Sequence, residues 1–218
     1  IIAHYKPLAA KVGERVVGTL QADLEHAPDP AGQSPLGQAV ADSILEASAG
    51  QGVGQAQLAL MNTGGIRAEL VRPPNAPPGA PFTVTFSRVF DVLPFGNAIV
   101  VKTITGEVLT RLLEQQFERR VMFLQVSKGF SYTFDASKPV GQRVVPGSIQ
   151  LNGQPVHAGD RLRVATVDYV WNGGDGFSVA KEGTDATMVG DGLEAFVSYL
   201  GRHSPVVPPD GGRVRRLP

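Results

Sequence analysis

Six side chains suited to holding a small molecule occur in three glycine-containing stretches of the sequence: Asn62, Arg67, Phe95, Asn97, Tyr169 and Asp175. Aromatic rings can stack on the two faces of a nucleobase, each for about 1 to 3 kcal/mol. A carboxylate accepts hydrogen bonds from ribose hydroxyls, and a guanidinium binds phosphate. If the fold brings these residues together, they favour a nucleoside-binding site.

Each candidate also has an ordinary structural interpretation. Arg67 is typical of a solvated or ion-paired arginine, Phe95 of a ring in the core, and Asp175, which lies between glycines, of a turn. Spacing along the sequence does not decide between the two interpretations, because it does not show whether the three stretches converge.

Residue patterns that support catalysis on their own do not occur in the sequence. There is no cysteine, the glycines at 50–54 and 64–65 match neither a phosphate loop nor a dinucleotide fingerprint, and no G-x-S-x-G nucleophile elbow occurs. The four histidines lie far apart, without the close pairing typical of metal sites: His4, His26, His157 and His203. We therefore predict no catalytic residue and no metal ligand in this chain.

The composition is that of an ordinary folded domain. Of the 218 residues, 42% are hydrophobic and 18% charged, which is enough to bury one sizeable core and excludes a disordered chain. Twenty basic and twenty acidic residues give a net charge of zero, so neither nucleic acid nor a membrane is an expected partner. No apolar run approaches the roughly 20 residues of a membrane-spanning helix. The N-terminus has neither a starting Met nor the shape of a signal peptide, and we expect the chain to be excised from a longer protein.

Hydrophobic patterning predicts the elements that must position the six side chains. Strands are predicted at 16–20, 58–61, 82–86, 98–104, 130–134, 148–151 and 162–167. Helices are predicted after the capping pair Ser34-Pro35, after Thr105, and over 193–200. Strands and helices mix without regular alternation, which predicts an α+β fold with a mixed sheet.

Four motifs then occur in a fixed order: Asn62–Arg67 (NTGGIR), Leu93–Asn97 (LPFGN), Phe123–Ser127 (FLQVS) and Ala165–Phe177, which ends in NGGDGF. In order and spacing they resemble the C-terminal domain of the 5'-nucleotidase and UDP-sugar hydrolase family. The resemblance implies a four-layer α/β/β/α domain with mixed sheets over residues 16–218. It also implies that residues 1–15 form a linker or hinge to a preceding domain.

The resemblance further implies a function. In this family the C-terminal domain binds the nucleotide, while a separate N-terminal metallophosphatase domain holds two divalent metal ions and hydrolyses nucleoside phosphates to nucleoside and phosphate. The motifs D-x-H and G-N-H-[ED] of that domain do not occur in the 218 residues, so the chain alone is expected to be inactive. Most relatives are periplasmic, secreted or on the cell surface, which implies a periplasmic or secreted location.

Carried over position by position, the resemblance implies roles for all six candidates: clamping of the base by Phe95 and Tyr169, hydrogen bonding near base or ribose by Asn62 and Asn97, ribose binding by Asp175, and phosphate binding by Arg67. Two positions depart from the family. Tyr169 stands where phenylalanine is usual, a mild change because its ring still stacks. Residues 29–33, just before Ser34, contain no cation where the family usually has arginine. Losing such a charge-assisted bond, worth about 1.5 to 3 kcal/mol, weakens binding about tenfold or more.

Other interpretations stay open at this point. As a non-catalytic scaffold or dimerisation module, the domain would keep its aromatic residues in the core. As a relative of the sulfur-oxidation thiosulfohydrolases, it would receive a carrier-bound sulfur group, although two stacking rings favour a base. A cyclic nucleotide or a UDP-sugar is a further substrate candidate. The sequence decides neither base preference nor oligomeric state.

Overall fold

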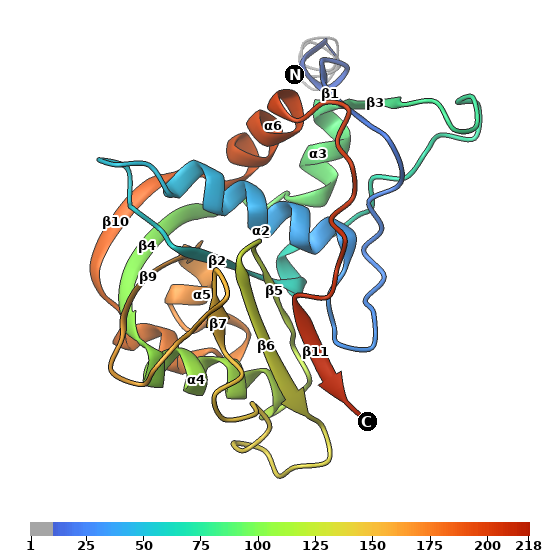
Figure 1. Ribbon diagram of the computed structural model, residues 1–218. Coiled ribbons are helices and arrows are strands. Elements are labelled where there is room, and N and C mark those ends of the chain that lie inside the picture. Colours follow the sequence, from blue (N-terminus) through green and yellow to red (C-terminus); the bar gives the residue numbers. More distant parts are fainter. Residues whose placement is uncertain (1–10) are drawn as a thin grey trace.

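The computed structural model describes residues 11–218, and its centre is a five-stranded mixed sheet (Figure 1). From edge to edge the strands are β10 (Thr184–Asp191), β4 (Ala98–Thr105), β9 (Arg161–Val167), β2 (Leu58–Asn62) and β5 (Leu124–Val126). β2 and β9 run parallel, while the other neighbours are antiparallel. Every residue of β2 and β5 is buried, which fits a strand covered on both faces.

Helices cover both faces of this sheet (Figure 1). α2 (Pro35–Ser48) lies against β2 and β5, and α6 (Gly192–Arg202) packs beside it. α4 (Gly106–Glu114) and α5 (Asp168–Trp171) contact β4 from the opposite side, and α3 (Phe86–Val92) packs on α6. Among residues 11–218 there are also four short 3-10 helices: η1 (Thr63–Gly65), η2 (Gln115–Phe117), η3 (Gly174–Gly176) and η4 (Ser178–Glu182).

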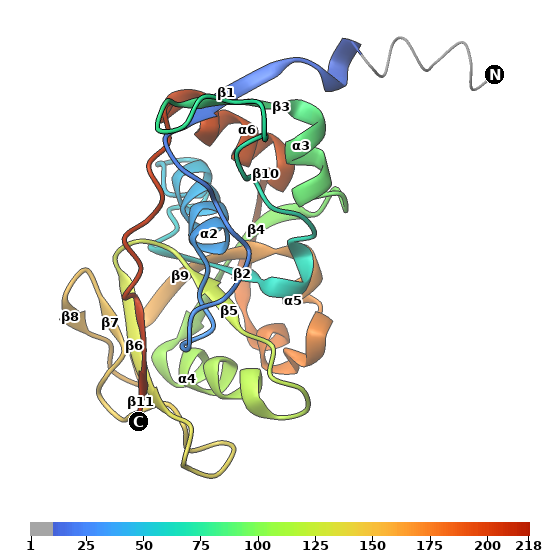
Figure 2. The same ribbon diagram turned by 90° about the vertical axis from the view of Figure 1, so that its right-hand side faces the viewer.

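Two smaller sheets flank the central one. The first has the order β11 (Val214–Leu217), β6 (Phe130–Asp135), β7 (Gln150–Leu151) and β8 (Gln154–Pro155), with β11 parallel to β6. The second pairs β1 (Val16–Leu20) with β3 (Phe82–Thr85), at the end of the molecule near α3 and α6 (Figure 2). The predicted class, α+β with mixed sheets, is confirmed.

The predicted start of α2 is formed as expected. Ser34 Oγ accepts a hydrogen bond from the backbone N–H of Gly37 at 3.0 Å, and Pro35 occupies the first helical position, where it gives up no hydrogen bond. At the start of α4, Gly106 is required, because a Cβ there would collide with the carbonyl oxygen of His157. The start of α2 is therefore specified locally, whereas Gly106 at the start of α4 is required by packing against a segment distant in the sequence.

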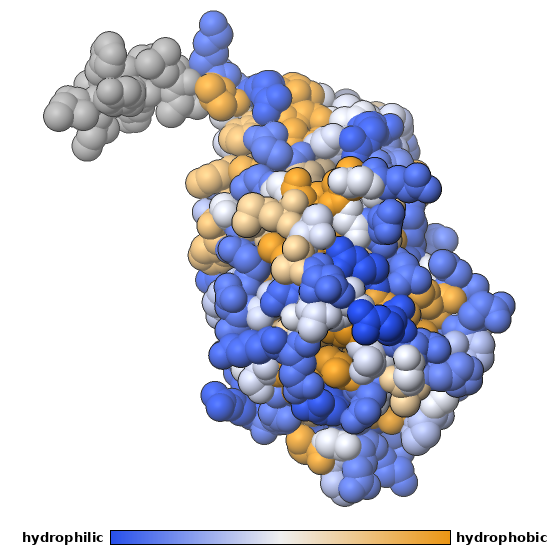
Figure 3. Space-filling view, turned by 90° about the vertical axis from the view of Figure 1, so that its left-hand side faces the viewer, coloured by the Kyte–Doolittle hydropathy of each residue, from blue (hydrophilic) through white to orange (hydrophobic). Residues whose placement is uncertain are grey.

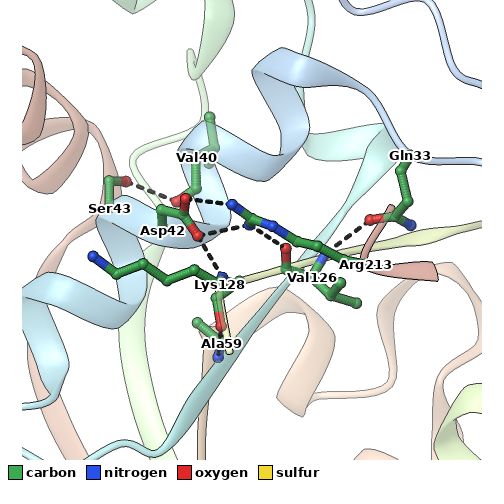
Figure 4. A network of polar contacts seen from close by, with 9 residues as sticks. Gln33, Val40, Asp42, Ser43, Ala59, Val126, Lys128 and Arg213 are labelled. Carbon is green, nitrogen blue, oxygen red and sulfur yellow. Dashed lines mark hydrogen bonds and ion pairs between the residues drawn. The ribbon is translucent and has the colours of Figure 1, made fainter. Parts of the chain in front are cut away.

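A buried ion pair fastens the C-terminal segment to α2 (Figure 4). The Arg213 guanidinium donates to the Asp42 carboxylate at 2.7 and 2.8 Å, and the two side chains are only 14% and 6% exposed. Asp42 also accepts from the backbone N–H of Lys128 at 2.6 Å, and Arg213 donates to the carbonyl of Val126 at 2.8 Å. This cluster, the α2 ion pair, ties α2, the end of β5 and the C-terminal segment together.

Four strands are absent from the sequence prediction: β5, β8, β10 and β11. β10 is a sheet edge with mostly exposed side chains, among them Met188 at 74%. On the face that carries β10, hydrophobic residues form separate groups among hydrophilic ones (Figure 3). The chain ends in β11, beyond the last predicted helix.

Two expectations from the sequence concern the chain as a whole. Of the predicted linker over 1–15, residues 1–10 lie outside the described range, so the linker stays a prediction. Among residues 11–218, no helix combines the length and the apolar character needed to cross a membrane.

Candidate functional site

The topology of the central sheet brings the three polar stretches to one edge. β2 and β9 are parallel neighbours, with Leu58 opposite Val164, and β4 runs antiparallel to β9, with Ile99 opposite Val167. The ends of β2 and β9 and the beginning of β4 therefore lie side by side. Asn62 ends β2, the loop with Phe95 and Asn97 leads into β4, and Tyr169 follows β9. Ligands of mixed α/β sheets bind at such edges, beyond the carboxyl ends of parallel strands.

A cleft of about 340 Å³ opens at this edge, and its lining contains five of the six candidates: Asn62, Phe95, Asn97, Tyr169 and Asp175, together with Gly64 and Gly65. The sixth candidate, Arg67, lies beside the cleft. Its guanidinium carbon is 6.0 Å from the centre of the Phe95 ring, and its Nη1 donates to the carbonyl of Gly64 at 3.3 Å. All six predicted residues thus gather in one place.

The two aromatic rings of the cleft are exposed. The residue Phe95 is 57% exposed and Tyr169 is 46% exposed, although most large apolar side chains of the chain are buried. The Tyr169 ring also packs flat against the backbone of Gly174, where any Cβ would collide with it. The interpretation of Phe95 as a core ring is therefore wrong, and both rings present surface to the cleft.

Three lining residues, Asn62, Tyr169 and Asp175, form a polar cluster that we call the floor of the cleft. The Asp175 carboxylate accepts hydrogen bonds from Asn62 Nδ2 at 2.7 Å and from the Tyr169 hydroxyl at 3.1 Å. Asp175 has a left-handed backbone with φ of 54°, a conformation that a short polar side chain tolerates. Its donors are neutral, so ligand hydroxyls can replace them without breaking an ion pair. Asn62 Oδ1 is buried and has no hydrogen-bond partner among the described residues, so it can serve as an acceptor.

The positive charge beside the cleft comes from Arg67 and not from the nearby His26. Burial lowers the pKa of His26, and the positive charge of Arg67 lowers it further, while Glu69 opposes the shift. His26 is therefore neutral at physiological pH and adds no positive charge next to Arg67. Within residues 11–218, no group of three or more histidine and acidic side chains is arranged to hold a metal ion.

The segment before α2, where the family usually has arginine, serves the structure instead. Asp29 Oδ1 accepts from the backbone N–H groups of Ala31 and Gln33 at 2.8 and 2.9 Å. The Gln33 side chain donates to the carbonyl of Leu124 and accepts from the backbone N–H of Val126, and so satisfies the outer edge of β5. None of these residues lines the cleft.

Sequence reasoning missed the part that Gly64 plays. A Cβ on Gly64 would lie 3.0 Å from Asp175 Oδ2 and 3.5 Å from Met122 Cε, so a larger residue would disturb the carboxylate. The glycine pair in the turn after β2 is the signal that could have shown this. Met122, which reaches the same place from the segment before β5, carries no recognisable signal in the sequence.

Comparison with known proteins identifies the family. The family described as "5'-nucleotidase, C-terminal domain" matches residues 16–182. The chain belongs to this family. The chain is similar to the trifunctional nucleotide phosphoesterase protein YfkN of Bacillus subtilis, with 33% identity over 194 residues, which cover 85% of the chain and 12% of that protein.

Solved structures of family members show the same fold. A 5'-nucleotidase precursor from Thermus thermophilus matches with a TM-score of 0.80 and 29% identity, over 99% of this chain and 42% of that one. The sulfate thiohydrolase SoxB of Thermus thermophilus matches with a TM-score of 0.70, over 99% of this chain and 37% of that one, but its 15% identity shows the fold alone. The fold implied by the resemblance is confirmed. The chain spans 12% of the YfkN protein and less than half of either solved structure, so it corresponds to a part of each.

Proposed function

We propose that this domain binds a nucleoside phosphate, with the base held between Phe95 and Tyr169. The observation that carries the proposal is the pair of half-exposed rings that line one cleft together with polar side chains. Exposed aromatic rings in water cost free energy that stacking on a base recovers, at about 1 to 3 kcal/mol per ring. The cleft of about 340 Å³ is within the range of small-molecule sites.

The remaining roles follow from the atoms at the floor and rim. The Asp175 carboxylate, now bonded to the neutral donors Asn62 and Tyr169, accepts the ribose hydroxyls in their place. Asn97 and the free Oδ1 of Asn62 offer hydrogen bonds to the base or ribose. Arg67, whose guanidinium has a backbone carbonyl but no carboxylate as acceptor among residues 11–218, binds the phosphate.

In the whole protein, the domain would position the nucleotide for hydrolysis to nucleoside and phosphate. The two divalent metal ions that activate water would belong to an N-terminal metallophosphatase domain, linked through residues 1–15. Among residues 11–218, no group of three or more histidine and acidic side chains is arranged to hold these ions. We place the protein in the periplasm or outside the cell; the word "precursor" in the name of the Thermus relative supports processing after synthesis.

Calorimetric titration of the chain with adenosine and AMP tests the proposal. Fluorescence is less direct, because the only tryptophan, Trp171, is buried and donates to the carbonyl of Val100. Wild type should bind both ligands, and Phe95→Ala should weaken both by about five- to 100-fold, since one stacking face is lost. Phe90→Ala is the matched control, because Phe90 is 47% exposed but lies outside the cleft.

Two outcomes would contradict the proposal. If neither ligand binds the folded wild-type chain, the cleft holds no nucleoside. This result would favour the scaffold or the thiosulfohydrolase interpretation. If Phe95→Ala binds as well as Phe90→Ala does, the rings do not clamp a base.

A further inference from the structure

A second arginine, in the segment between η2 and β5, is linked through Met122 to the glycine turn that lines the cleft. Arg120 lies in this exposed segment and directs its guanidinium to the sulfur of Met122, with Nε and Nη2 at 3.3 and 3.1 Å. A thioether is a weak acceptor, so this contact orients the guanidinium without neutralising it. The charge stays available to a stronger acceptor.

Met122 places this arginine next to the floor of the cleft. The Cβ position of Gly64 is 3.5 Å from Met122 Cε and 3.0 Å from Asp175 Oδ2, so Met122 and Asp175 face the same side of Gly64. The carbonyl of Gly64 accepts from Arg67. Both arginines are therefore connected to the glycine turn. Arg67 donates directly to the carbonyl of Gly64, and Arg120 contacts Met122, which lies next to Gly64.

Hydrogen bonds hold the Arg120 segment against the loop that carries Asp175. Gln115, in η2, donates to the Ser178 hydroxyl at 2.9 Å and accepts from the backbone N–H of Val179 at 2.9 Å. Met122 N–H in turn donates to the carbonyl of Gln116 at 2.9 Å. The base of the segment is thus tied to η4, three residues beyond Asp175, and in Figure 2 the chain after α4 reaches the side of the molecule that carries α5.

No carboxylate among the described residues pairs with Arg120. Glu182 is bound bidentately by Arg111, Glu118 accepts from Gln115, and Asp175 accepts from its two neutral donors. An arginine fork that is oriented but not neutralised suits a phosphate, which accepts two parallel N–H bonds.

We propose that Arg120 is a second phosphate-positioning residue, which binds the phosphate of a nucleotide whose ribose lies on Asp175. The inference rests on the proposed function and narrows it: the site discriminates nucleoside phosphates from nucleosides through Arg120 as well as Arg67. Arg120 is a positioning residue and takes no part in bond cleavage.

Titration of the full chain with adenosine, AMP and ADP tests this role. In Arg120→Ala, affinity for AMP and ADP should fall about tenfold, the loss expected for one charge-assisted hydrogen bond, while affinity for adenosine stays within about twofold. Arg119→Ala is the matched control, since it removes the same charge one residue away and should change all three affinities by less than about twofold. Raising the salt concentration should weaken AMP binding less in Arg120→Ala than in wild type, because one ionic contact is gone.

The outcomes separate this inference from the proposed function. If wild type binds adenosine but Arg120→Ala binds AMP normally, or loses adenosine and AMP affinity equally, the role of Arg120 is wrong and the base site stands. If Arg119→Ala loses as much affinity for AMP as Arg120→Ala does, the effect comes from the overall positive charge of the segment, and the specific role of Arg120 is also wrong. Failure of wild type to bind adenosine or AMP would instead refute the proposed function itself.

Discussion

The carboxylates of Asp42 and Asp175 each accept several hydrogen bonds. They differ in the charge of their donors and in how far they are exposed to solvent. Asp42, on α2, is 4% exposed and binds the guanidinium of Arg213 through both oxygens. Asp175, at the edge of the sheet, is half-buried and receives one bond from Asn62 and one from Tyr169. The first carboxylate joins elements of the fold, and the second lies in an open cleft.

The difference shows what makes a carboxylate available to a ligand. A buried ion pair resists exchange, because removing one partner leaves an uncompensated charge away from water. At a half-exposed site, ligand hydroxyls can replace neutral donors at little net cost in free energy. The carboxylate keeps its number of hydrogen bonds, and the displaced donors bond to water. The α2 ion pair is therefore expected to govern stability and the Asp175 cluster to govern binding.

The largest expected effect is on stability at the α2 ion pair. Arg213→Ala should lower the free energy of unfolding by about 3 to 5 kcal/mol, because Asp42 is left charged and buried. Urea denaturation measures this change. Arg215→Ala, on an exposed position of β11, is the control and should change stability by no more than about 0.5 kcal/mol. Equal losses in both variants would mean that the ion pair is not what fastens the C-terminal segment.

The next effect is on binding at Asp175. Asp175→Asn removes the negative charge and should weaken adenosine binding by about tenfold or more, since hydrogen bonds to charged groups contribute about 1.5 to 3 kcal/mol. Asparagine keeps the size and tolerates the left-handed backbone, so stability should stay nearly constant. Calorimetry and urea denaturation together separate the two effects.

Asp185→Asn is the matched control for this change. Asp185 has φ of 51°, close to the 54° of Asp175, and its exposed carboxylate pairs with Arg161 away from the cleft. Its substitution should leave adenosine affinity unchanged. Normal adenosine binding by Asp175→Asn would show that the carboxylate serves only its own loop, and the contrast with Asp42 would disappear.

A smaller effect is expected at Tyr169. Tyr169→Phe keeps the stacking face and removes only the hydroxyl that donates to Asp175 at 3.1 Å. Adenosine affinity should fall by no more than about tenfold, because the ring still stacks and the ribose hydroxyls replace the Tyr169 hydroxyl at Asp175 when the ligand binds. Tyr169→Leu, which removes the aromatic face as well, should bind more weakly than Tyr169→Phe. Equal affinities in these two variants would mean that this ring does not stack on the base.

The sequence indicated the candidate residues more readily than the sheet that gathers them. Residues such as Asn62 and Asp175 are recognisable because their types and motifs are specific. Their convergence depends on β2 and β9 being parallel neighbours, a pairing between segments about 100 residues apart that no local pattern encodes. The exposure of Phe95 is likewise a tertiary property, and composition alone favours a buried ring.

The strands that were missed share a physical reason. β10 and β11 lie at sheet edges, where only one face is covered and polar residues are tolerated, so neither shows the apolar run or the clean alternation of a central strand. Strand β5 has only three residues. The role that we propose for Arg120 has no signal in the sequence for a related reason: it rests on Met122 and Gly64, which approach each other only in the folded chain.

The smallest expected effect concerns a third carboxylate, Glu46, which lies one helical turn after Asp42 on α2. It accepts from Arg202 and pairs with His203, both at 2.7 Å, and its side chain is 26% exposed. Burial by itself raises the pKa of Glu46, but the hydrogen bonds from His203 and Arg202 outweigh it and hold the pKa below the ordinary 4.5. Glu46 should therefore stabilise the fold above about pH 4.5 and lose this contribution as the pH falls through its lowered pKa.

Urea denaturation of wild type and Glu46→Gln at pH 7, 4.5 and 3 measures this contribution. At pH 7, Glu46→Gln should be less stable than wild type by at most about 1 kcal/mol, because water screens a partly exposed pair. The difference in the free energy of unfolding should shrink below pH 4.5, because Glu46 is then protonated and as uncharged as the glutamine of the variant. If it persists unchanged at pH 3, the charge of Glu46 adds nothing.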